Sequence, residues 1–375
     1  MEPPPLFSAY PLEDYRAHRA TIDEALRRML EAGHYILGSE VENFEKEFAA
    51  FVGVKHGIGV ANGTDAIELL LRGLDIGRGA AVAVPSHTAV ASVSAIARAG
   101  ARPVFVDVDP RTFTMNAAGL AAALDSTHGT EIKAVLAVHL YGHPADLSSI
   151  GDLCAKRGLA LLEDCAQSHG AVHHGRNAGS VGRGSSFSFY PTKNLGAIGD
   201  GGAVCTNDDE LAQKIRWIRQ YGWRERYISA LEGVNSRLDE MQAAILRVKL
   251  PHLAASNEKR RALAARYAAG LKGLPVQIPV EAESCRHVYH LYVVRAERRD
   301  ALLQHLTQRG VPAALHYPAA VHQQPAYFQV AKESPALPHT DALIKDILSL
   351  PLHPHLSTDA VDAACAALRE FYQRR

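Results

Sequence analysis

The chain has 375 residues, of which 47% are hydrophobic and 21% charged, and its 40 basic side chains (Lys+Arg) equal its 40 acidic ones. This length and composition are typical of a soluble globular protein with one large domain and a smaller one, and the balanced charge gives no overall attraction to nucleic acid or to an anionic membrane. The first residues lack the pattern of a secretory leader, no apolar run is long enough to span a bilayer, and the five cysteines form no CxxC pair, so we expect a cytoplasmic protein with free thiols.

Short apolar runs alternate with amphipathic helical patterns through the first two-thirds of the chain. Because strands that alternate with helices build parallel sheets, this order predicts an α/β fold with a mainly parallel sheet covered by helices on both faces. The predicted strands are residues 57–60, 81–84, 103–106, 134–138, 159–162 and 202–206, and the predicted helices are residues 65–74, 88–99, 116–124, 146–156 and 208–220.

The last third of the chain has a different pattern. Residues 238–250 are predicted to form a helix that Pro251 stops. We therefore predict a large domain over residues 1–250 and a smaller C-terminal α+β domain over residues 251–375. The predicted elements of the small domain are helices at 254–271, 298–308 and 358–373 and a strand at 287–294.

Lys193 is the only lysine in the Gly-rich stretch from 185 to 205. It follows a short run of alternating aromatic and serine residues that predicts a strand, and the glycines after it allow the backbone to approach a ligand closely. A solubilising surface lysine is the alternative. The position suits an amine that enters a crowded pocket and forms a Schiff base with an aldehyde cofactor.

The segment Asn62-Gly63-Thr64-Asp65 follows a predicted strand and opens a predicted helix. Gly63 and Thr64 would present backbone N–H groups at the positive end of the helix dipole, which is a natural phosphate site. A plain helix N-cap is the alternative. The glycines at 57, 59 and 63 miss the dinucleotide-binding spacing by one residue.

A second polar segment, Glu163-Asp164-Cys165-Ala166-Gln167, follows the predicted strand at 159–162. A carboxylate at the carboxyl end of a parallel strand lies where open α/β sheets bind their ligands. Asp164 could hold the protonated nitrogen of a pyridine ring, and Gln167 could contact a phenolic oxygen of that ring. The alternative for Asp164 is a helix cap.

Two further polar side chains could reach a phosphate. Asn235 lies in a polar turn before a predicted helix, where a capping box from Ser236 to Asp239 is the alternative. Ser188 lies on the strand before Lys193, where an ordinary strand serine is the alternative.

The 19 histidines give chance pairs rather than a metal motif. His139 and His143 are four residues apart but flank Leu-Tyr-Gly in a segment that leaves a strand, so we expect no metal site. Neither a Gly-x-Ser-x-Gly elbow nor a Walker motif is present, which disfavours a hydrolase or a nucleotide kinase.

Together these segments resemble the DegT/DnrJ/EryC1/StrS family of sugar aminotransferases, a branch of the fold-type-I aminotransferases that depend on pyridoxal 5′-phosphate. Weaker similarity extends from about residue 8 to about residue 355. The resemblance implies a large domain with a mainly parallel sheet and a small C-terminal α+β domain. The blocks that carry it are residues 62–66, 163–167, 187–196 and 235–244, in that order.

The resemblance also implies a role for each candidate residue. Lys193 would be the catalytic lysine that binds the cofactor covalently, Asp164 would hold the pyridine nitrogen, and Gln167 would contact the ring hydroxyl. The neighbouring subunit would supply one phosphate contact, so the protein would be a homodimer with shared active sites. The phosphate contacts would be Gly63, Thr64 and Ser188 of one chain and Asn235 of the other.

One position departs from the family pattern. The family usually places an aromatic residue after Pro-Ser-x-Thr, stacked on the cofactor ring, whereas residues 85–89 read Pro-Ser-His-Thr-Ala here. With Ala89 in that place, either His87 or another side chain has to cover the ring. We therefore predict His87 as a candidate cofactor contact.

Within the family, residues 189–197 and 218–227 look most like enzymes that aminate the 3-keto group of dTDP-linked 6-deoxyhexoses with L-glutamate as the amino donor. The alternatives are a 4-keto-sugar aminotransferase with a UDP-, GDP- or dTDP-linked substrate and a non-catalytic regulatory protein of the same fold. Relatives that dehydrate a sugar have histidine in place of the lysine, so Lys193 argues against a dehydratase. The candidates for the nucleotide-sugar side are Arg219, Tyr221, Tyr317 and His322.

Overall fold

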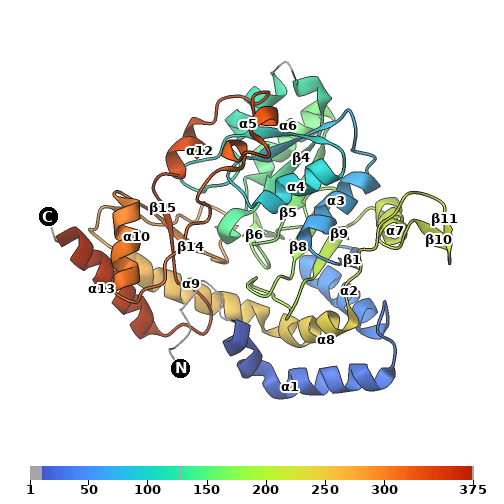
Figure 1. The fold of residues 1–375 in the computed structure, drawn as a ribbon, viewed down its shortest axis with the longest axis horizontal. Helices are drawn as coiled ribbons and strands as arrows, with labels where there is room; N and C mark the ends of the chain where they lie inside the picture. Colours follow the sequence, from blue (N-terminus) through green and yellow to red (C-terminus); the bar gives the residue numbers. More distant parts are fainter. Residues whose placement is uncertain (1–10, 127, 374–375) are drawn as a thin grey trace.

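A seven-stranded sheet forms the centre of the computed structural model, which describes residues 11–126 and 128–373 (Figure 1). Its strand order is β1-β9-β8-β5-β4-β2-β3, and only β9 runs antiparallel to its neighbours. The predicted α/β fold with a mainly parallel sheet is therefore confirmed. The strands are β1 (His56–Val60), β2 (Ala81–Pro85), β3 (Arg102–Val106), β4 (Ile132–Val138), β5 (Ala160–Asp164), β8 (Gly184–Ser188) and β9 (Gly202–Thr206).

Helices cover both faces of this sheet because successive strand side chains point to opposite sides. On β2, Val82 and Val84 belong to the core beneath α3 and α4, whereas Ala81 and Ala83 belong to the core beneath α5 and α6. The first face is covered by α3 (Gly63–Gly73), α4 (Val90–Arg98) and α7 (Asp209–Ile218), and the second by α2 (Ser39–Val52), α5 (Ala117–Leu124), α6 (Leu147–Arg157) and α8 (Glu240–Lys249).

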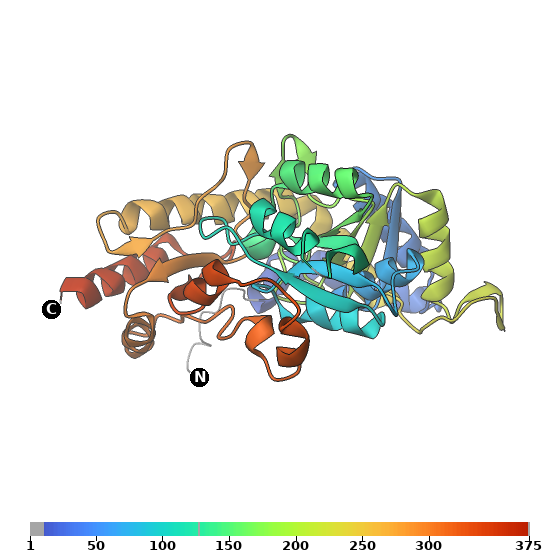
Figure 2. The same ribbon diagram turned by 90° about the horizontal axis from the view of Figure 1, so that it is seen from above.

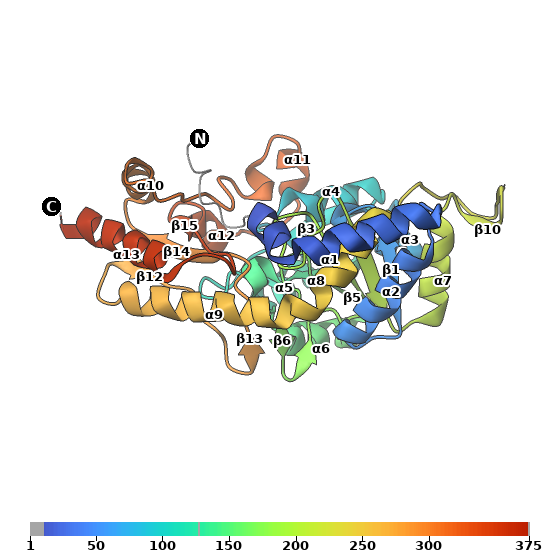
Figure 3. The ribbon, with the colours of Figure 1, turned by 90° about the horizontal axis from the view of Figure 1, so that it is seen from below.

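The amino-terminal helix α1 (Pro11–Ala32) lies along α8 (Figure 3). The helix predicted to stop at Pro251 does end at Lys249, but the 3-10 turn η3 (Leu250–His252) leads directly into α9 (Leu253–Gly270). Proline fits the first turn of a helix because the N–H that it lacks has no partner there. The helical path therefore continues across residue 250, and a domain division at that residue stays a prediction.

The C-terminal part contains a small antiparallel sheet of strands β12 (Val276–Gln277), β14 (Tyr292–Ala296) and β15 (Ile347–Leu350). Helices α9, α10 (Arg299–Gln308) and α13 (Thr358–Gln373) pack on this sheet around one hydrophobic cluster. The predicted strand at 287–294 is wrong in its first half. There, Val288 donates to Gly142 O (3.0 Å) and Leu291 to Tyr141 O (3.3 Å), so these N–H groups bind a turn instead of a strand.

The shorter elements connect these layers. A hairpin of β10 (Trp223–Glu225) and β11 (Ile228–Ser229) projects away from the rest of the molecule (Figure 2). Within the described residues, no helix is long and apolar enough to cross a membrane. The remaining elements are β6 (Val172–His173), β7 (Arg176–Asn177), β13 (Cys285–Arg286), α11 (Phe328–Ala331), α12 (Pro338–Leu343), η1 (Gly129–Glu131), η2 (Leu140–Gly142) and η4 (Val321–Gln323).

Candidate active site

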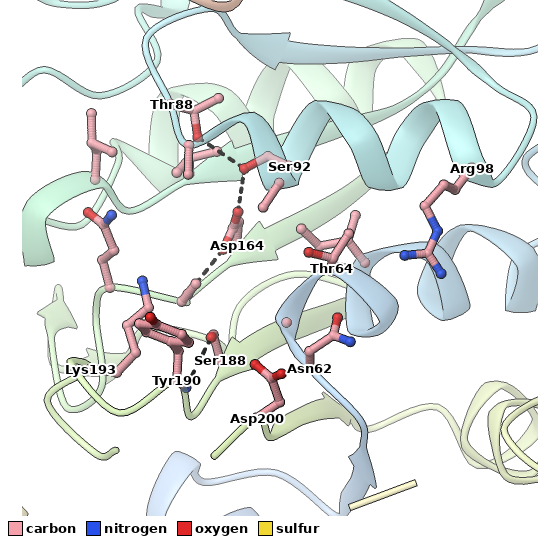
Figure 4. Close-up of a pocket in the computed structure, with 18 residues that line it drawn as sticks. Asn62, Thr64, Thr88, Ser92, Arg98, Asp164, Ser188, Tyr190, Lys193 and Asp200 are labelled. Carbon is pink, nitrogen blue, oxygen red and sulfur yellow. Dashed lines mark hydrogen bonds between the residues drawn. The ribbon is translucent and has the colours of Figure 1, made fainter. Parts of the chain in front are cut away.

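A cleft of about 360 Å³ opens where β4, β5 and β8 end and α3 and α4 begin (Figure 4). This is the edge at which open α/β sheets bind ligands. Six of the predicted residues (Gly63, Thr64, Asp164, Gln167, Ser188 and Lys193) meet there although they come from three separate sequence blocks. The lining residues are Asn62, Gly63, Thr64, Ile67, Thr88, Ala89, Ala91, Ser92, Arg98, Val138, Leu140, Asp164, Ala166, Gln167, Ser188, Tyr190, Lys193 and Asp200.

The start of α3 forms one end of the cleft. Asn62 is the N-cap, and its side-chain oxygen accepts the N–H of Asp65 at 2.8 Å. The earlier N–H groups, those of Gly63 and Thr64, belong to the first turn, where no intrahelical acceptor exists. A cap and a phosphate site are therefore compatible here, because the cap uses a different N–H group.

Gly63 is required at this place for steric reasons. A Cβ atom on Gly63 would lie 2.7 Å from Cβ of Ser188, so any larger residue would push the start of α3 away from β8. Gly202 behaves in the same way, with a Cβ that would lie 2.4 Å from the backbone of Asn62. The two glycines bring helix N–H groups and the Ser188 hydroxyl together, which suits a phosphate.

Asp164 is the last residue of β5 and is 5% exposed. Ser92 Oγ donates to Oδ2 at 2.7 Å, and the N–H of Ala166 donates to Oδ1 at 3.0 Å (Figure 4). Thr88 Oγ1 lies 3.0 Å from Ser92 Oγ and continues this network. The carboxylate is therefore held in one orientation within the cleft, next to the first turn of α4.

The adjacent carboxylate, Glu163, points to the other face of the sheet, as strand alternation requires. It accepts the N–H groups of Gly179, Val181 and Gly182 at 2.7–2.8 Å. Burial opposes ionisation of Glu163, yet the hydrogen bond with His139 and those backbone donors lower its pKa overall.

Together with Cys165, His139 and Glu163 form a buried group with the residue types of a metal site. His139 Nδ1, however, accepts the N–H of Ala145 at 2.9 Å, and His139 Nε2 lies 3.0 Å from Glu163. Because both ring nitrogens are engaged, this group fits an internal hydrogen-bond network better than it fits metal ligation.

Lys193 enters the cleft from the turn after β8, where its N–H donates to Tyr190 O at 2.8 Å. No hydrogen-bond or ion-pair partner of its Nζ exists among the described residues. Burial lowers the pKa of Lys193 to about 8, although the nearby Asp164 carboxylate opposes this shift. The amine is therefore neutral in a large fraction of molecules near pH 8, as a nucleophile must be.

Gln167 also lines the cleft, and its side chain is fixed at both ends. Its Oε1 accepts the N–H of Tyr141 at 2.7 Å, and its Nε2 donates to the hydroxyl of Tyr317 at 3.1 Å. The structure thus brings Tyr317, predicted as a contact of the nucleotide sugar, next to a predicted contact of the cofactor ring.

His87 does not line the cleft. Its ring is 1% exposed, and its Nε2 lies 2.7 Å from the hydroxyl of Tyr141. Burial lowers the pKa of His87 to about 4. We therefore withdraw His87 as a direct cofactor contact, because its buried side chain bonds Tyr141 and is not among the residues that line the cleft. Ala89 does line the cleft, as does Tyr190, whose side chain is 52% exposed.

Arg219, predicted as a contact of the nucleotide sugar, does not line the cleft. It is 7% exposed, forms an ion pair with Glu45, and donates to Gly59 O at 2.8 Å. These bonds tie the end of α7 to β1 and α2. Arg219 therefore supports the packing of the large sheet and does not face the cleft.

Replacing Arg219 with methionine should lower the free energy of unfolding by about 3 kcal/mol, because Glu45 would keep a mostly buried charge without its ion-pair partner. Urea denaturation followed by circular dichroism measures this loss, and the double variant Arg219→Met/Glu45→Gln should recover part of it. An unchanged stability with a raised KM for the nucleotide sugar would restore the original assignment.

The remaining candidates lie outside the cleft of their own chain. His322 is used at both ring nitrogens, by Ser86 Oγ at 2.7 Å and by Asp341 Oδ1 at 3.0 Å, so it joins α12 to the end of β2. Tyr221 is 39% exposed and packs beside Trp223 at the base of the hairpin. Asn235 is exposed. The capping box, which was the alternative interpretation of this turn, does not form, because Ser236 Oγ donates to Asp65 Oδ2 at 2.7 Å.

Sequence reasoning missed three residues of the site. Ser92 and Thr88 hold Asp164, and their spacing of four residues on a predicted helix was the available signal. Tyr141 has a left-handed backbone with a φ of 60°, which is uncommon for a bulky residue and is often found at functional sites. No pattern in its neighbourhood marked it.

The donor set fits pyridoxal 5′-phosphate. The cleft offers two helix N–H groups and a hydroxyl for a phosphate, a carboxylate for a pyridinium nitrogen, an amide for a phenolic oxygen, and an amine of lowered pKa for an aldehyde. The tight contact between Gly63 and Ser188 is the observation that fits the phosphate most directly.

Comparison with known proteins gives the same result. Residues 16–369 match the model of the DegT/DnrJ/EryC1/StrS aminotransferase family. The chain is 46% identical over 361 residues to a dTDP-3-amino-3,4,6-trideoxy-α-D-glucose transaminase of Streptomyces venezuelae (96% of this chain, 94% of the relative). It is 42% identical over 347 residues to a UDP-2-acetamido-2-deoxy-3-oxo-D-glucuronate aminotransferase of Pseudomonas aeruginosa (92% and 95%).

Among solved structures, S. venezuelae DesV in complex with a ketimine intermediate superposes with a TM-score of 0.94 at 45% identity, covering 100% of both chains. The family model spans nearly the whole chain, and both relatives are more than 40% identical to it. The chain belongs to the DegT/DnrJ/EryC1/StrS aminotransferase family and is a nucleotide-sugar transaminase that depends on pyridoxal 5′-phosphate.

Proposed function

We propose that this aminotransferase moves the amino group of L-glutamate to the keto carbon of a dTDP-linked 3-keto-6-deoxyhexose, giving a dTDP-amino-sugar and 2-oxoglutarate. The observation that supports transamination is the meeting of Lys193, Asp164 and the start of α3 in one cleft. The dTDP-3-amino-sugar transaminase of S. venezuelae supports the choice of sugar.

The bound cofactor supplies an aldehyde and a ring that withdraws electrons from the reacting carbon. Gly63, Thr64 and Ser188 would hold its phosphate, and Asp164 would hold the ring nitrogen in the orientation that Ser92 and Ala166 impose on the carboxylate. Lys193 Nζ, once free, accepts the proton from the α-carbon of glutamate and returns a proton to the sugar carbon in the second half-reaction. Its lowered pKa suits it to both transfers.

A UDP-linked or 4-keto substrate is the second candidate, and the P. aeruginosa relative, whose name describes a UDP-linked 3-oxo sugar, favours a UDP-linked one. Incubation with glutamate and a panel of dTDP- and UDP-linked 3-keto and 4-keto sugars, followed by mass spectrometry and NMR of the product, separates these cases. We expect the highest kcat/KM for the dTDP-linked 3-keto sugar. A protein that binds the cofactor but turns over none of the panel would favour a regulatory role.

We also propose a homodimer in which Asn235 of one subunit completes the phosphate site of the other, because Asn235 is exposed and does not line the cleft of its own chain. Hybrid dimers of Lys193→Ala and Asn235→Ala would then contain one intact site, with Lys193 from one subunit and Asn235 from its partner.

Mixing and dissociating the two variants should regain up to about a quarter of wild-type activity at limiting cofactor, since half of the random dimers are hybrid and each has one intact site. Each variant alone is the control. A mixture that stays as inactive as its components would place Asn235 and Lys193 in the same subunit's site.

A further inference from the structure

A chain of hydrogen bonds links the C-terminal segment to the floor of the cleft. Tyr317 accepts a hydrogen bond from Gln167 Nε2 at 3.1 Å, and Gln167 Oε1 accepts one from the N–H of Tyr141 at 2.7 Å. The hydroxyl of Tyr141 donates to the carbonyl oxygen of His316 and lies 2.7 Å from His87 Nε2. Four segments of the chain meet in this network.

The chemistry of the groups fixes the direction of each bond. A carbonyl oxygen accepts only, so the single proton of the Tyr141 hydroxyl goes to His316, and His87 Nε2 must carry the proton that it shares with Tyr141. A backbone N–H donates only, so the Gln167 oxygen faces Tyr141 and the Gln167 nitrogen faces Tyr317. The amide of Gln167 therefore has one orientation.

Two hydrogens of this network have no acceptor among the residues that the structure describes: the hydroxyl proton of Tyr317 and the second hydrogen of Gln167 Nε2. Gln167 lines the cleft. Burial, the largest influence, raises the pKa of Tyr317 to about 12, while the bond from Gln167 works against the rise and the Asp164 carboxylate adds to it. Tyr317 therefore stays protonated at working pH and keeps its donor.

We propose that Tyr317 is a positioning residue of the cofactor ring: it holds the Gln167 amide so that the second Nε2 hydrogen points at the phenolic oxygen of the bound ring. This rests on the proposed role of Lys193, Asp164 and Gln167 in cofactor binding. His87 and Tyr141 support the same amide from the other side, which gives the buried His87 a place in the site although it does not line the cleft.

The consequence concerns the proton shared by the ring oxygen and the nitrogen of Lys193. A donor aimed at the phenolic oxygen stabilises its negative charge and so favours loss of that proton. In Tyr317→Phe the amide keeps only its bond from the Tyr141 N–H and loses the partner that aligns Nε2. The pH midpoint of the visible absorbance of the Lys193-bound cofactor should therefore rise by about half a unit to one unit.

The test is a spectroscopic pH titration of the cofactor-loaded protein. Tyr292→Phe is the matched control, because it removes a buried hydroxyl on β14 that does not line the cleft, and its midpoint should equal that of the wild type. Gln167→Ala should raise the midpoint at least as much as Tyr317→Phe does, and the double variant should rise no further than Gln167→Ala, since Tyr317 acts only through the Gln167 donor. Steady-state kinetics of Tyr317→Phe should show a lower kcat with an unchanged KM for the sugar.

Two results would overturn the proposal. One is an unchanged midpoint with a raised KM for the nucleotide sugar, which would return Tyr317 to the substrate side. The other is an additive shift in the double variant, which would show that Tyr317 acts independently of Gln167. A wild-type protein without any visible band would instead contradict the proposed function itself, so the two failures are distinguishable.

Discussion

Lys193→Ala should reduce transamination by at least about 10⁴-fold, because it removes both the amine that captures the cofactor and the base that moves the proton. The visible absorbance of the bound cofactor should disappear in the same variant. The fold should survive, since Lys193 Nζ has no hydrogen-bond or ion-pair partner among the described residues, and its side chain therefore carries no structural bond there.

A control variant and a pH profile test this prediction. Lys156→Ala, which removes an exposed lysine at the end of α6, is the matched control and should keep wild-type activity. In the wild type, the rate of covalent cofactor capture should rise with pH and level off above about 8, because burial lowers the pKa of Lys193 to about 8 and only the neutral amine reacts. A capture rate that still rises steeply at pH 10 would contradict the lowered pKa, and activity near wild type in Lys193→Ala would contradict the assignment of the lysine.

Asp164→Asn should lower kcat by about 10²–10³-fold, the usual effect of removing one preorganised charged partner from an active site. The amide has nearly the same shape as the carboxylate, so the change tests charge and not packing. An asparagine has no negative charge to balance a protonated ring nitrogen, and the ring then withdraws electrons less strongly from the reacting carbon.

Ser92→Ala is the graded comparison for this prediction. It keeps the carboxylate but removes the 2.7 Å hydrogen bond to Oδ2, so we expect a loss of about tenfold, consistent with one hydrogen bond to a charged group. Steady-state kinetics and the absorption spectrum of the bound cofactor measure both variants. Equal losses in Ser92→Ala and Asp164→Asn would show that orientation matters more than charge, and a fully active Asp164→Asn would remove Asp164 from the mechanism.

Several parts of the site were predictable because their chemistry is local. Gly63 opens α3, Asp164 ends β5, and Lys193 follows β8, and each position is set by a strand or helix signal within a few residues. The parallel sheet then brings these positions to one edge, because the carboxyl ends of parallel strands meet there. Boundaries were less accurate: β5 continues two residues beyond its predicted end and includes Asp164 itself.

Two residues that were predicted only from their nearness to a motif bond other parts of the protein and do not line the cleft. Arg219 was predicted to bind substrate, yet it pairs with Glu45 on α2 and with the backbone of β1, far away in the sequence. His322 is engaged by Ser86 and Asp341 in the same manner. Whether an arginine or a histidine is free to bind a ligand depends on groups that are distant in the sequence and pack against it in the fold. A local sequence pattern does not contain this information.

By itself, the sequence determined the α/β fold, the family, the lysine, the strand-end carboxylate and the glycine at the start of α3, because short motifs and hydrophobic periodicity encode each of them. Only the tertiary structure decided which side chains Gln167, Tyr317 and His87 contact. Gln167 and Tyr317 lie 150 residues apart, and their contact exists only after the C-terminal segment packs against the sheet. Side-chain partners that meet across such a distance are chosen by packing and by the need to pair buried polar groups, which are properties of the whole fold.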